Sequence, residues 1–486
     1  MRTAPLIPLA ALALLSGACS APPPSDPALT EISGVSVIDV AQGRAVTGQD
    51  IVLRDGRIVW VGPDGQSPLP EPGRRIEAAG LYALPGLWDS HVHVFSAPDE
   101  PDTALPLYIL HGVTSVRDMG ATIPLGAQRE VSDAVAAGER VGPRIIHAGA
   151  LIDGPPGSWP GQMVAATPGE GRAHVREAAA LGWTSVKAYS LLGRDTYFAI
   201  AEEADALGLP LYGHVPETVT LKDAVTAGQD VLEHFGWVTS ACSTQEDAMA
   251  EGARAALASD DPFPALMAEL ARHSMITYQS WDKTLCDAPI RALVDAEVAI
   301  APTLMVADFY LGDFPKADDP RMLTLPADVR AAWGEPDFRL EAMTDELRAV
   351  APLAVMQDRE TFKLAHDAGV VMLASTDAAF LNPFLFHGAT LLDELDRYAE
   401  IGLSSQDVLA TATLNPARLF GEDGESGALE KGQRADIILL RDNPLETIAA
   451  IRQLEVVVAN GRVFDRNALD ALHTELRDRA EAPKDD

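Results

Sequence analysis

The chain has 486 residues, 47% of them hydrophobic and 22% charged, which is the composition of a globular protein with a large core. Its formal net charge of −34 argues against nucleic acid as a partner, because the phosphate backbone would be repelled. An acidic surface can also attract cationic substrates, but we prefer solubility or a salty habitat as the explanation of this charge.

Residues 1–18 are typical of an export signal that is removed from the mature protein. A short apolar run, Leu6–Leu15, follows a positively charged start and is followed by small residues. Cys19 comes directly after them, as in a bacterial lipoprotein leader whose cysteine carries the lipid. Leu15 lies one residue too far from Cys19 for that pattern, so lipidation and ordinary cleavage both stay open. We expect an exported protein, periplasmic or membrane-anchored only through Cys19, with residues 19–29 as a solvated linker.

The two ends of the chain contain short strand-like runs. Residues 30–84 hold such runs around Asp55-Gly56, and residues 422–469 hold others around Asn460-Gly461; both dipeptides favour hairpin turns. Neither end has enough strands for a stable sheet alone, so we predict that both ends pair into one small β-sandwich. Residues 470–486 are expected to form a charged C-terminal tail, a helix that frays.

Residues 85–421 alternate between strand-like runs and helical stretches. Eight strand-plus-helix units predict a (β/α)8 TIM barrel, an α/β fold, with insertions near residues 240–290 and 309–345. The second insertion could be a lid over the site or a surface decoration. The strand-like runs are LWDSHVHV, GVTSVRDMG, PRIIHAGAL, TSVKAYS, LPLYGHV, DVLEHFG, VAIAPTLMV and VVMLASTDA.

His91 and His93 alternate on the first of these strands, so both imidazoles face the same side. Imidazole is a common zinc ligand, and two from one strand make half of a metal site. Further polar residues fall at the same end of later strands, where the active site of a barrel lies. They are Lys187, His214, His234 and Asp377.

Each of these residues has an ordinary interpretation when it is taken alone. The histidines could be hydrogen-bonded core residues, Lys187 a surface lysine and Asp377 a helix N-cap. However, Lys187 is flanked by apolar residues, which makes a buried cation unfavourable unless something uses it. The position of all of these side chains at one end of the strands favours a shared metal site.

The chain resembles the amidohydrolase superfamily over nearly all of its mature length. The ordered set of HxH, Lys, His, His and Asp is similar to the binuclear branch, and the VKxY form of the fourth strand is similar to prolidase-like dipeptidases. The segments that carry the resemblance are ALPGLWDSHVH, GVTSVRDMG, SVKAYS, GHV, VLEHFGW, APTL, STDA, TATLNPARLFG and GALEKGQRADIILLRDNPL.

The resemblance implies two divalent metal ions, most simply zinc, with manganese, iron or cobalt not excluded. His91, His93 and Asp377 would bind one ion. His214 and His234 would bind the other, and a carbamate formed by Lys187 with carbon dioxide would bridge the two. A hydroxide shared by the metals would attack the substrate carbonyl, while Asp377 would pass a proton to the leaving amine.

Two other residues are candidates for contact with the substrate. Tyr189 lies two residues after Lys187 and faces the same side, so it is either a substrate contact or a rim aromatic. His387 lies in the segment after Asp377, near the rim, and could also contact the substrate.

Two further pairs are treated as structural. Arg117 and Asp118, at the end of the second strand, are interpreted as an ion pair with each other. Cys242 and Cys286 could form a disulfide in an oxidising compartment or remain buried free thiols.

We therefore expect an exported, metal-dependent hydrolase that cuts an amide or peptide bond of a small molecule, of the dipeptide or N-acyl amino acid class. That substrate class follows from the resemblance alone. A lactone or cyclic-amide hydrolase on the same site is the alternative. An alternative of another class, a surface binding protein with a relic site, is opposed by the intact ligand set. The sequence does not indicate the exact substrate or the oligomeric state.

Overall fold

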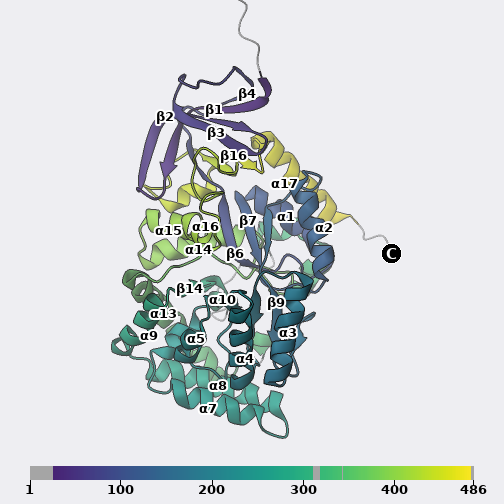
Figure 1. The fold of residues 1–486 in the computed structure, drawn as a ribbon, viewed down its shortest axis with the longest axis vertical. Coiled ribbons are helices and arrows are strands. Elements are labelled where there is room, and N and C mark those ends of the chain that lie inside the picture. Colours follow the sequence, from purple (N-terminus) through teal and green to yellow (C-terminus); the bar gives the residue numbers. More distant parts are fainter. Residues whose placement is uncertain (1–25, 310–317, 342, 483–486) are drawn as a thin grey trace, which may run out of the picture.

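The computed structural model describes residues 26–309, 318–341 and 343–482, so the expected export signal and Cys19 lie outside the described residues. The described chain is a mixed α/β fold with parallel sheets. Figure 1 shows a sheet built from the chain ends at one end of the molecule and parallel strands surrounded by helices below it. None of the described helices is both long and apolar enough to cross a bilayer.

The sheet at one end joins both ends of the chain. Its strand order is β17-β16-β15-β5-β1-β2-β3, with β4 paired to β1. The two chain ends pair with each other, as we predicted, and the long, bulged β1 pairs with β2, β4 and β5. That this sheet forms a sandwich stays a prediction. β1 also begins inside the predicted linker. The strands are β1 (Asp26–Asp39), β2 (Arg44–Arg54), β3 (Arg57–Pro63), β4 (Pro72–Glu77), β5 (Tyr82–Pro85), β15 (Ile437–Leu440), β16 (Leu454–Ala459) and β17 (Arg462–Phe464).

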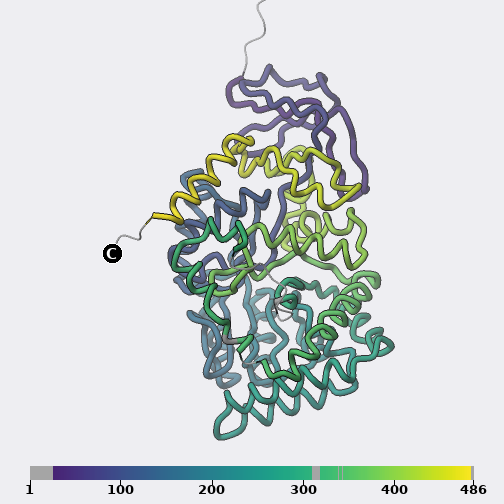
Figure 2. The backbone as a smooth tube through the Cα atoms, turned by 180° about the vertical axis from the view of Figure 1, so that it is seen from behind, coloured from purple at the N-terminus to yellow at the C-terminus, as the bar shows by residue number. Residues whose placement is uncertain are grey.

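The C-terminal helix α17 (Arg466–Glu481) includes the helix that we expected from residue 470, but it begins earlier and packs against the rest of the chain. The Asp465 side chain accepts a hydrogen bond from the Ala468 N–H and so caps the helix. Leu469, Leu472 and Leu476 are buried on one face of the helix. From both sides of the molecule, α17 lies beside the chain's early helices (Figures 1 and 2).

The central residues form two parallel sheets. One has the order β6-β7-β8 and the other the order β10-β9-β11-β12-β13-β14. The strands are β6 (Leu87–Val92), β7 (Val113–Asp118), β8 (Arg144–His147), β9 (Ala150–Asp153), β10 (Met163–Val164), β11 (Val186–Ala188), β12 (Leu211–Gly213), β13 (Val231–Glu233) and β14 (Ala299–Ala301).

The run that precedes Asp377 lies between the last strand of one parallel sheet and the first strand of the other. On one side, the Leu373 N–H donates to the Ile300 carbonyl in β14 at 2.8 Å. On the other side, the Ser90 N–H in β6 donates to the Ala374 carbonyl at 2.8 Å. These bonds bring Asp377 next to the strand that carries His91.

Helices connect and surround the parallel strands. Their starts follow local rules; for example, Thr167 and Glu170 form a reciprocal capping box at the start of α3. The α-helices are α1 (Glu100–Leu110), α2 (Leu125–Ala136), α3 (Pro168–Leu181), α4 (Arg194–Ala206), α5 (Leu221–Ala227), α6 (Gly236–Ala241), α7 (Glu246–Leu257), α8 (Pro262–Ser280), α9 (Asp287–Asp295), α10 (Leu304–Phe309), α11 (Ala327–Gly334), α12 (Phe338–Glu341), α13 (Asp345–Ala368), α14 (Ala389–Ile401), α15 (Ser405–Thr411) and α16 (Leu414–Leu419). The 3-10 helices are η1 (Lys283–Leu285), η2 (Pro320–Thr324) and η3 (Ile448–Arg452).

Cys242 and Cys286 form a disulfide, with Cα atoms 4.6 Å apart, which decides between the two states left open by the sequence. The bridge joins the end of α6 to the start of α9. The helices α7 and α8 lie between the two cysteines in sequence, so the bridge closes the predicted insertion near residues 240–290.

Gly213 tests how tightly β11 and β12 approach each other. Its φ is +120°, and a Cβ at this position would lie 2.1 Å from the Ala188 carbonyl oxygen. We expect Gly213→Ala to lower the free energy of unfolding by about 2–5 kcal/mol, because backbone strain adds to the clash. Gly208→Ala is the control, since Gly208 has φ +67° with nothing within 4 Å of a Cβ, and should cost about 1–2 kcal/mol. Denaturant unfolding followed by circular dichroism measures both variants, and equal midpoints would contradict the packing argument.

Candidate metal centre

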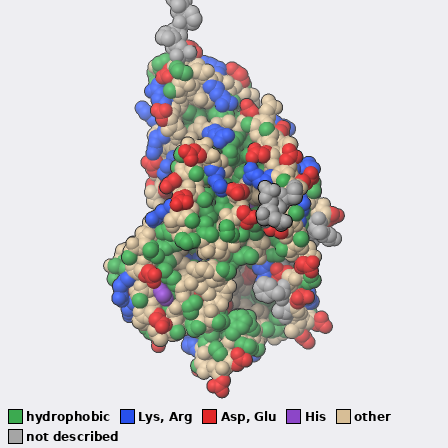
Figure 3. Space-filling view, turned by 90° about the vertical axis from the view of Figure 1, so that its right-hand side faces the viewer, with side chains coloured by type: hydrophobic (Ala, Val, Ile, Leu, Met, Phe, Trp, Pro, Cys, Tyr) green, Lys and Arg blue, Asp and Glu red, His purple; other side chains and the backbone are tan. Residues whose placement is uncertain are grey.

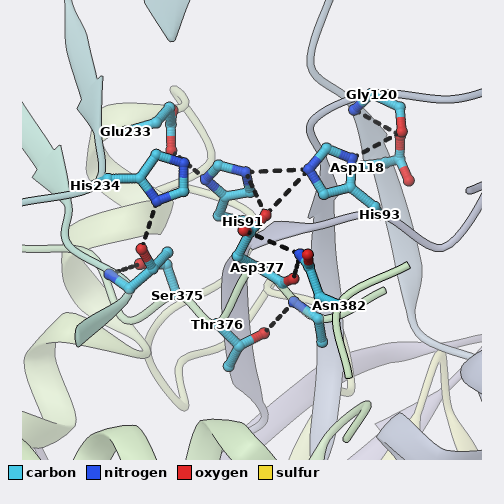
Figure 4. Close-up of polar contacts among 12 residues, drawn as sticks. His91, His93, Asp118, Gly120, Glu233, His234, Ser375, Thr376, Asp377 and Asn382 are labelled. Carbon is cyan, nitrogen blue, oxygen red and sulfur yellow. Dashed lines mark hydrogen bonds and ion pairs between the residues drawn. The ribbon is translucent and has the colours of Figure 1, made fainter. Parts of the chain in front are cut away.

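Three predicted ligands meet where β6 ends. The His91 Nε2 lies 3.3 Å from the His93 Nε2. The Asp377 Oδ1 lies 3.2 Å from the first nitrogen and 3.1 Å from the second. Figure 4 shows the two rings and the carboxylate turned toward one another. The Asp377 N–H donates to the His91 carbonyl at 2.8 Å, so the backbone fixes this approach.

All four predicted histidine ligands use the Nδ1 atom for a contact within the protein. This contact fixes each ring and leaves Nε2 for a metal, an arrangement typical of metal-binding histidines. The partners are Glu233 Oε2 for His91 at 2.8 Å, the Gly120 carbonyl for His93 at 2.8 Å, Ser190 Oγ for His214 at 2.7 Å, and Thr303 Oγ1 for His234 at 2.7 Å.

In the first group, two imidazole nitrogens and one carboxylate oxygen face one another. Burial lowers the pKa of His93, so its Nδ1 donates to Gly120 and its Nε2 keeps a lone pair. Burial opposes ionisation of Asp377, but its interactions with His91 and His93 outweigh burial and hold its pKa well below the usual value. One proton can join only two of the three atoms, whereas a metal cation satisfies all of them. Ligand atoms around a tetrahedral zinc ion lie about 3.3–3.4 Å apart, which matches this group.

His214, His234 and Lys187 form a second group beside the first. The His234 ring lies 4.8 Å from the His214 ring and 5.0 Å from the His91 ring, centroid to centroid. Burial lowers the pKa of both, well below the usual value for His214 and to about 4 for His234, so both are neutral at pH 7. The structure therefore brings all six predicted ligands into one region. Two of their nitrogen atoms, His214 Nε2 and the buried Lys187 Nζ, have no hydrogen-bond partner among the described residues.

Glu233 is a buried neighbour of the site that we did not predict from the sequence. Its carboxylate accepts hydrogen bonds from the His91 Nδ1 at 2.8 Å and the Arg117 Nη2 at 2.7 Å. Burial alone would raise the pKa of Glu233, but Arg117 and His91 lower it to about 2. The predicted ion pair between Arg117 and Asp118 is therefore wrong, because Asp118 instead accepts the backbone N–H of Val94 at 2.8 Å.

The backbone is strained at the site itself. His234 has φ 68°, Thr303 has φ 46° and Asp377 has φ 60°. Residues other than glycine rarely adopt this left-handed region, and such strain often lies at functional sites. Each of these residues is either a predicted ligand or the partner of one. The surrounding packing thus holds the side chains in directions that a regular strand would not give.

The two predicted substrate contacts differ in their surroundings. The Tyr189 ring stacks on His214, 4.0 Å between centroids, so it lies beside the second group, and contact with a substrate stays a prediction. His387 is buried, with Nε2 at 3.0 Å from Glu100 Oε1 and Nδ1 at 3.0 Å from the Tyr108 hydroxyl. Both of its nitrogens are used within the protein, which leaves none for a substrate. His387 joins the segment after Asp377 to α1.

A model of the amidohydrolase family matches residues 82–464. The chain belongs to the amidohydrolase family. It is 25% identical over 464 residues to an adenine deaminase from Ruegeria pomeroyi, covering 94% of this chain and 60% of that protein. The chain therefore spans about 60% of the length of this curated relative.

Solved structures of hydrolases share the fold of this amidohydrolase. A Xaa-Pro dipeptidase with methionine bound in its active site is 20% identical with a TM-score of 0.64, covering 90% of this chain and 100% of that one. The bottromycin amidohydrolase is 20% identical with a TM-score of 0.68, covering 94% of this chain and 91% of that one. Family membership places the chain among the hydrolases, and its clustered histidines and aspartate fit a metal ion.

Ser190→Ala tests whether the Nδ1 contacts orient the ligands. We expect metal affinity to fall about 10- to 100-fold, because the His214 ring loses the hydrogen bond that fixes it. Competition with a chromogenic chelator measures the affinity. Ser240→Ala is the control, since Ser240 lines the cavity beside His214 but makes no hydrogen bond to its ring. Wild-type affinity in the Ser190 variant would mean that this contact does not position the ligand.

Proposed function

We propose that this amidohydrolase binds two divalent metal ions, with zinc as the best match, and hydrolyses the amide bond of a dipeptide or an N-acyl amino acid. The observation that carries the proposal is the convergence of four oriented imidazoles, an ionised aspartate and a buried lysine whose Nζ has no hydrogen-bond partner among the described residues. His91, His93 and Asp377 would hold one ion. His214 and His234 would hold the other.

The same proposal includes a closed (β/α)8 barrel and a small sandwich domain at the chain ends. Hydrogen bonds on both sides of the run from Leu373 to Ala374 connect β14 to β6. The stretch from β8 to β9 connects the two parallel sheets at the other end, since β8 pairs with β7 and β9 pairs with β11. These contacts support a continuous ring of strands with the ligands at one mouth.

Lys187 is the proposed bridge between the ions. An ammonium group cannot coordinate a cation, so the lysine must first lose its charge. Burial lowers the pKa of Lys187 to about 8, which makes the neutral amine accessible near neutral pH. The neutral Nζ can add to carbon dioxide and release one proton, giving a carbamate whose two oxygens are anionic ligands.

The metals, when bound, would supply an activated water and polarise the substrate carbonyl. The protein residues provide the proton transfer. Asp377 is ionised and lies at the meeting point of the ligands, so it can take a proton from the attacking water and deliver it to the leaving nitrogen. The Asn382 Nδ2 donates to Asp377 Oδ2 at 3.1 Å and to the Asp377 carbonyl at 2.7 Å, which fixes the rotation of the carboxylate.

Adenine deamination is a second candidate function, favoured by the relative that matches 94% of this chain. Hydrolysis of a lactone or cyclic amide on the same site is a third. The orientation of the imidazoles argues against a binding protein with a relic site, because each ring is held so that its Nε2 atom is available to a metal. A screen of dipeptides, N-acyl amino acids, lactones and adenine with metal-loaded protein separates these candidates.

Lys187→Ala is the sharpest test of the binuclear centre. We expect elemental analysis to find close to two ions per chain in the wild type and fewer in this variant, with loss of amide hydrolysis. Short carboxylic acids should restore part of the activity, because they can supply the missing bridge. Lys222→Ala, at an exposed position of α5, is the control. Full activity of Lys187→Ala would exclude the bridging role, and one ion in the wild type would favour the deaminase.

Export remains part of the proposal, with a lipid on Cys19 as the only membrane contact. The disulfide between Cys242 and Cys286 supports an oxidising compartment. We expect Cys19→Ala to move the protein from the membrane fraction to the soluble fraction of the cell, as measured by immunoblotting of the fractions. Wild-type protein in the soluble fraction would point to ordinary cleavage of the leader.

A further inference from the structure

A cavity of about 400 Å³ opens beside His214 and His234. Its walls come from the loop after β12 and from α6, α7 and α8. Two of the proposed metal ligands line it, and the His214 Nε2 is buried without a partner among the described residues. A substrate whose amide bond reaches the metal centre would therefore place an adjoining group in this cavity.

Glu217 lies in the wall of this cavity and is fixed to the metal centre. Its N–H donates to the Ser190 carbonyl at 3.0 Å, and the Ser190 hydroxyl contacts the His214 Nδ1 at 2.7 Å. The same short loop thus positions a ligand and this carboxylate.

The Glu217 carboxylate has no hydrogen bond or ion pair with any residue that the structure describes. Burial alone raises its pKa to about 8, without an opposing contribution from a protein cation. The Glu217 side chain is half-buried, so its carboxylate is partly desolvated but still open to the cavity. A carboxylate in this position without a protein partner is a candidate for binding a ligand.

Apart from the proposed metal ligands and Glu217, the lining contains one more carboxyl group, that of Glu246. No lysine or arginine lines it among the described residues. Glu246 uses one oxygen to accept the Leu221 N–H at 2.7 Å, and His273 is bound by Glu269 with its pKa lowered by burial. The apolar part of the wall includes Trp237, whose ring can also face a cation.

We propose that Glu217 selects substrates with a positive charge at the end of an aliphatic stem, such as an arginine or lysine side chain next to the amide bond. This inference rests on the proposed amide hydrolysis. The carboxylate would pair with the cation, and the apolar wall would cover the stem.

The high net charge of the chain does not explain such selectivity by itself. On the face shown in Figure 3, acidic side chains are scattered among basic and hydrophobic ones. A diffuse surface charge can speed the arrival of cations, but selection between isosteric substrates needs a fixed partner.

The test compares arginine with citrulline, which has the same shape but no charge. We would measure kcat/KM of the zinc-loaded full chain for Gly-Arg, Gly-citrulline, Arg-Gly and citrulline-Gly. With arginine at either the first or the second position, we expect the arginine dipeptide to have a kcat/KM at least tenfold higher than its citrulline counterpart. This ratio corresponds to the free energy of a hydrogen bond to a charged group. Glu217→Gln should bring this ratio close to one. Glu251→Gln, which removes an exposed charge from α7, should keep the wild-type ratio.

Three outcomes would overturn the inference. A wild-type ratio near one with measurable hydrolysis would exclude cation selection and leave the proposed function intact. An unchanged ratio in Glu217→Gln, or its loss only in Glu246→Gln, would exclude Glu217 as the selecting residue. If neither these dipeptides nor any N-acyl amino acid of the screen is hydrolysed, the proposed function fails, and calorimetry with free arginine and citrulline tests the inference separately. Equal binding of the two would overturn it.

Discussion

The centre of this structure depends on two imidazole nitrogens and one carboxylate oxygen that lie within 3.3 Å of one another. Such an arrangement is unfavourable unless a cation fills it. The rest of the site keeps these lone pairs in place. Glu233 and the Gly120 carbonyl bind the far nitrogens of His91 and His93, so that neither ring can rotate without losing a bond.

The supporting residues also balance the charge of the buried site. Glu233 is ionised in the interior because the Arg117 guanidinium contacts it, and the Arg117 Nε donates to the Ser90 carbonyl at 2.6 Å. This ion pair lies behind the ligands and has no net charge. The Asp377 carboxylate is then left to balance a bound cation. The strained backbone at Asp377 and His234 shows that the surrounding sheets, and not local preference, set these directions.

Several parts of the fold and of the site could be predicted from the sequence because they depend on short-range geometry. The spacing of His91 and His93 follows from the period of a strand, and the other ligands follow from the rule that strand ends converge. The same period should have excluded a pair between Arg117 and Asp118, since neighbours on a strand face opposite sides.

Other features depended on contacts that the sequence does not show. Glu233 contacts Arg117 from another strand, and the only signal for it in the sequence is a carboxylate that follows two apolar residues of a strand. The surroundings of His387 depend on α1, which is far away in the chain. Strand register likewise decides which strands of the two chain ends become neighbours. The leucines of α17 are spaced three and four residues apart, which is typical of the apolar face of a packed helix. We weighted the many charged residues of this segment more than that spacing.

The disulfide between Cys242 and Cys286 encloses α7 and α8 in sequence, and these helices carry part of the cavity wall. All six proposed ligands lie outside the enclosed stretch. Thiol–disulfide exchange would therefore loosen the part of the cavity wall that α7 and α8 carry, while the proposed metal ligands and Glu217 lie outside the enclosed stretch. A change in redox environment would thus act first on the far wall of the cavity and not on the metal centre.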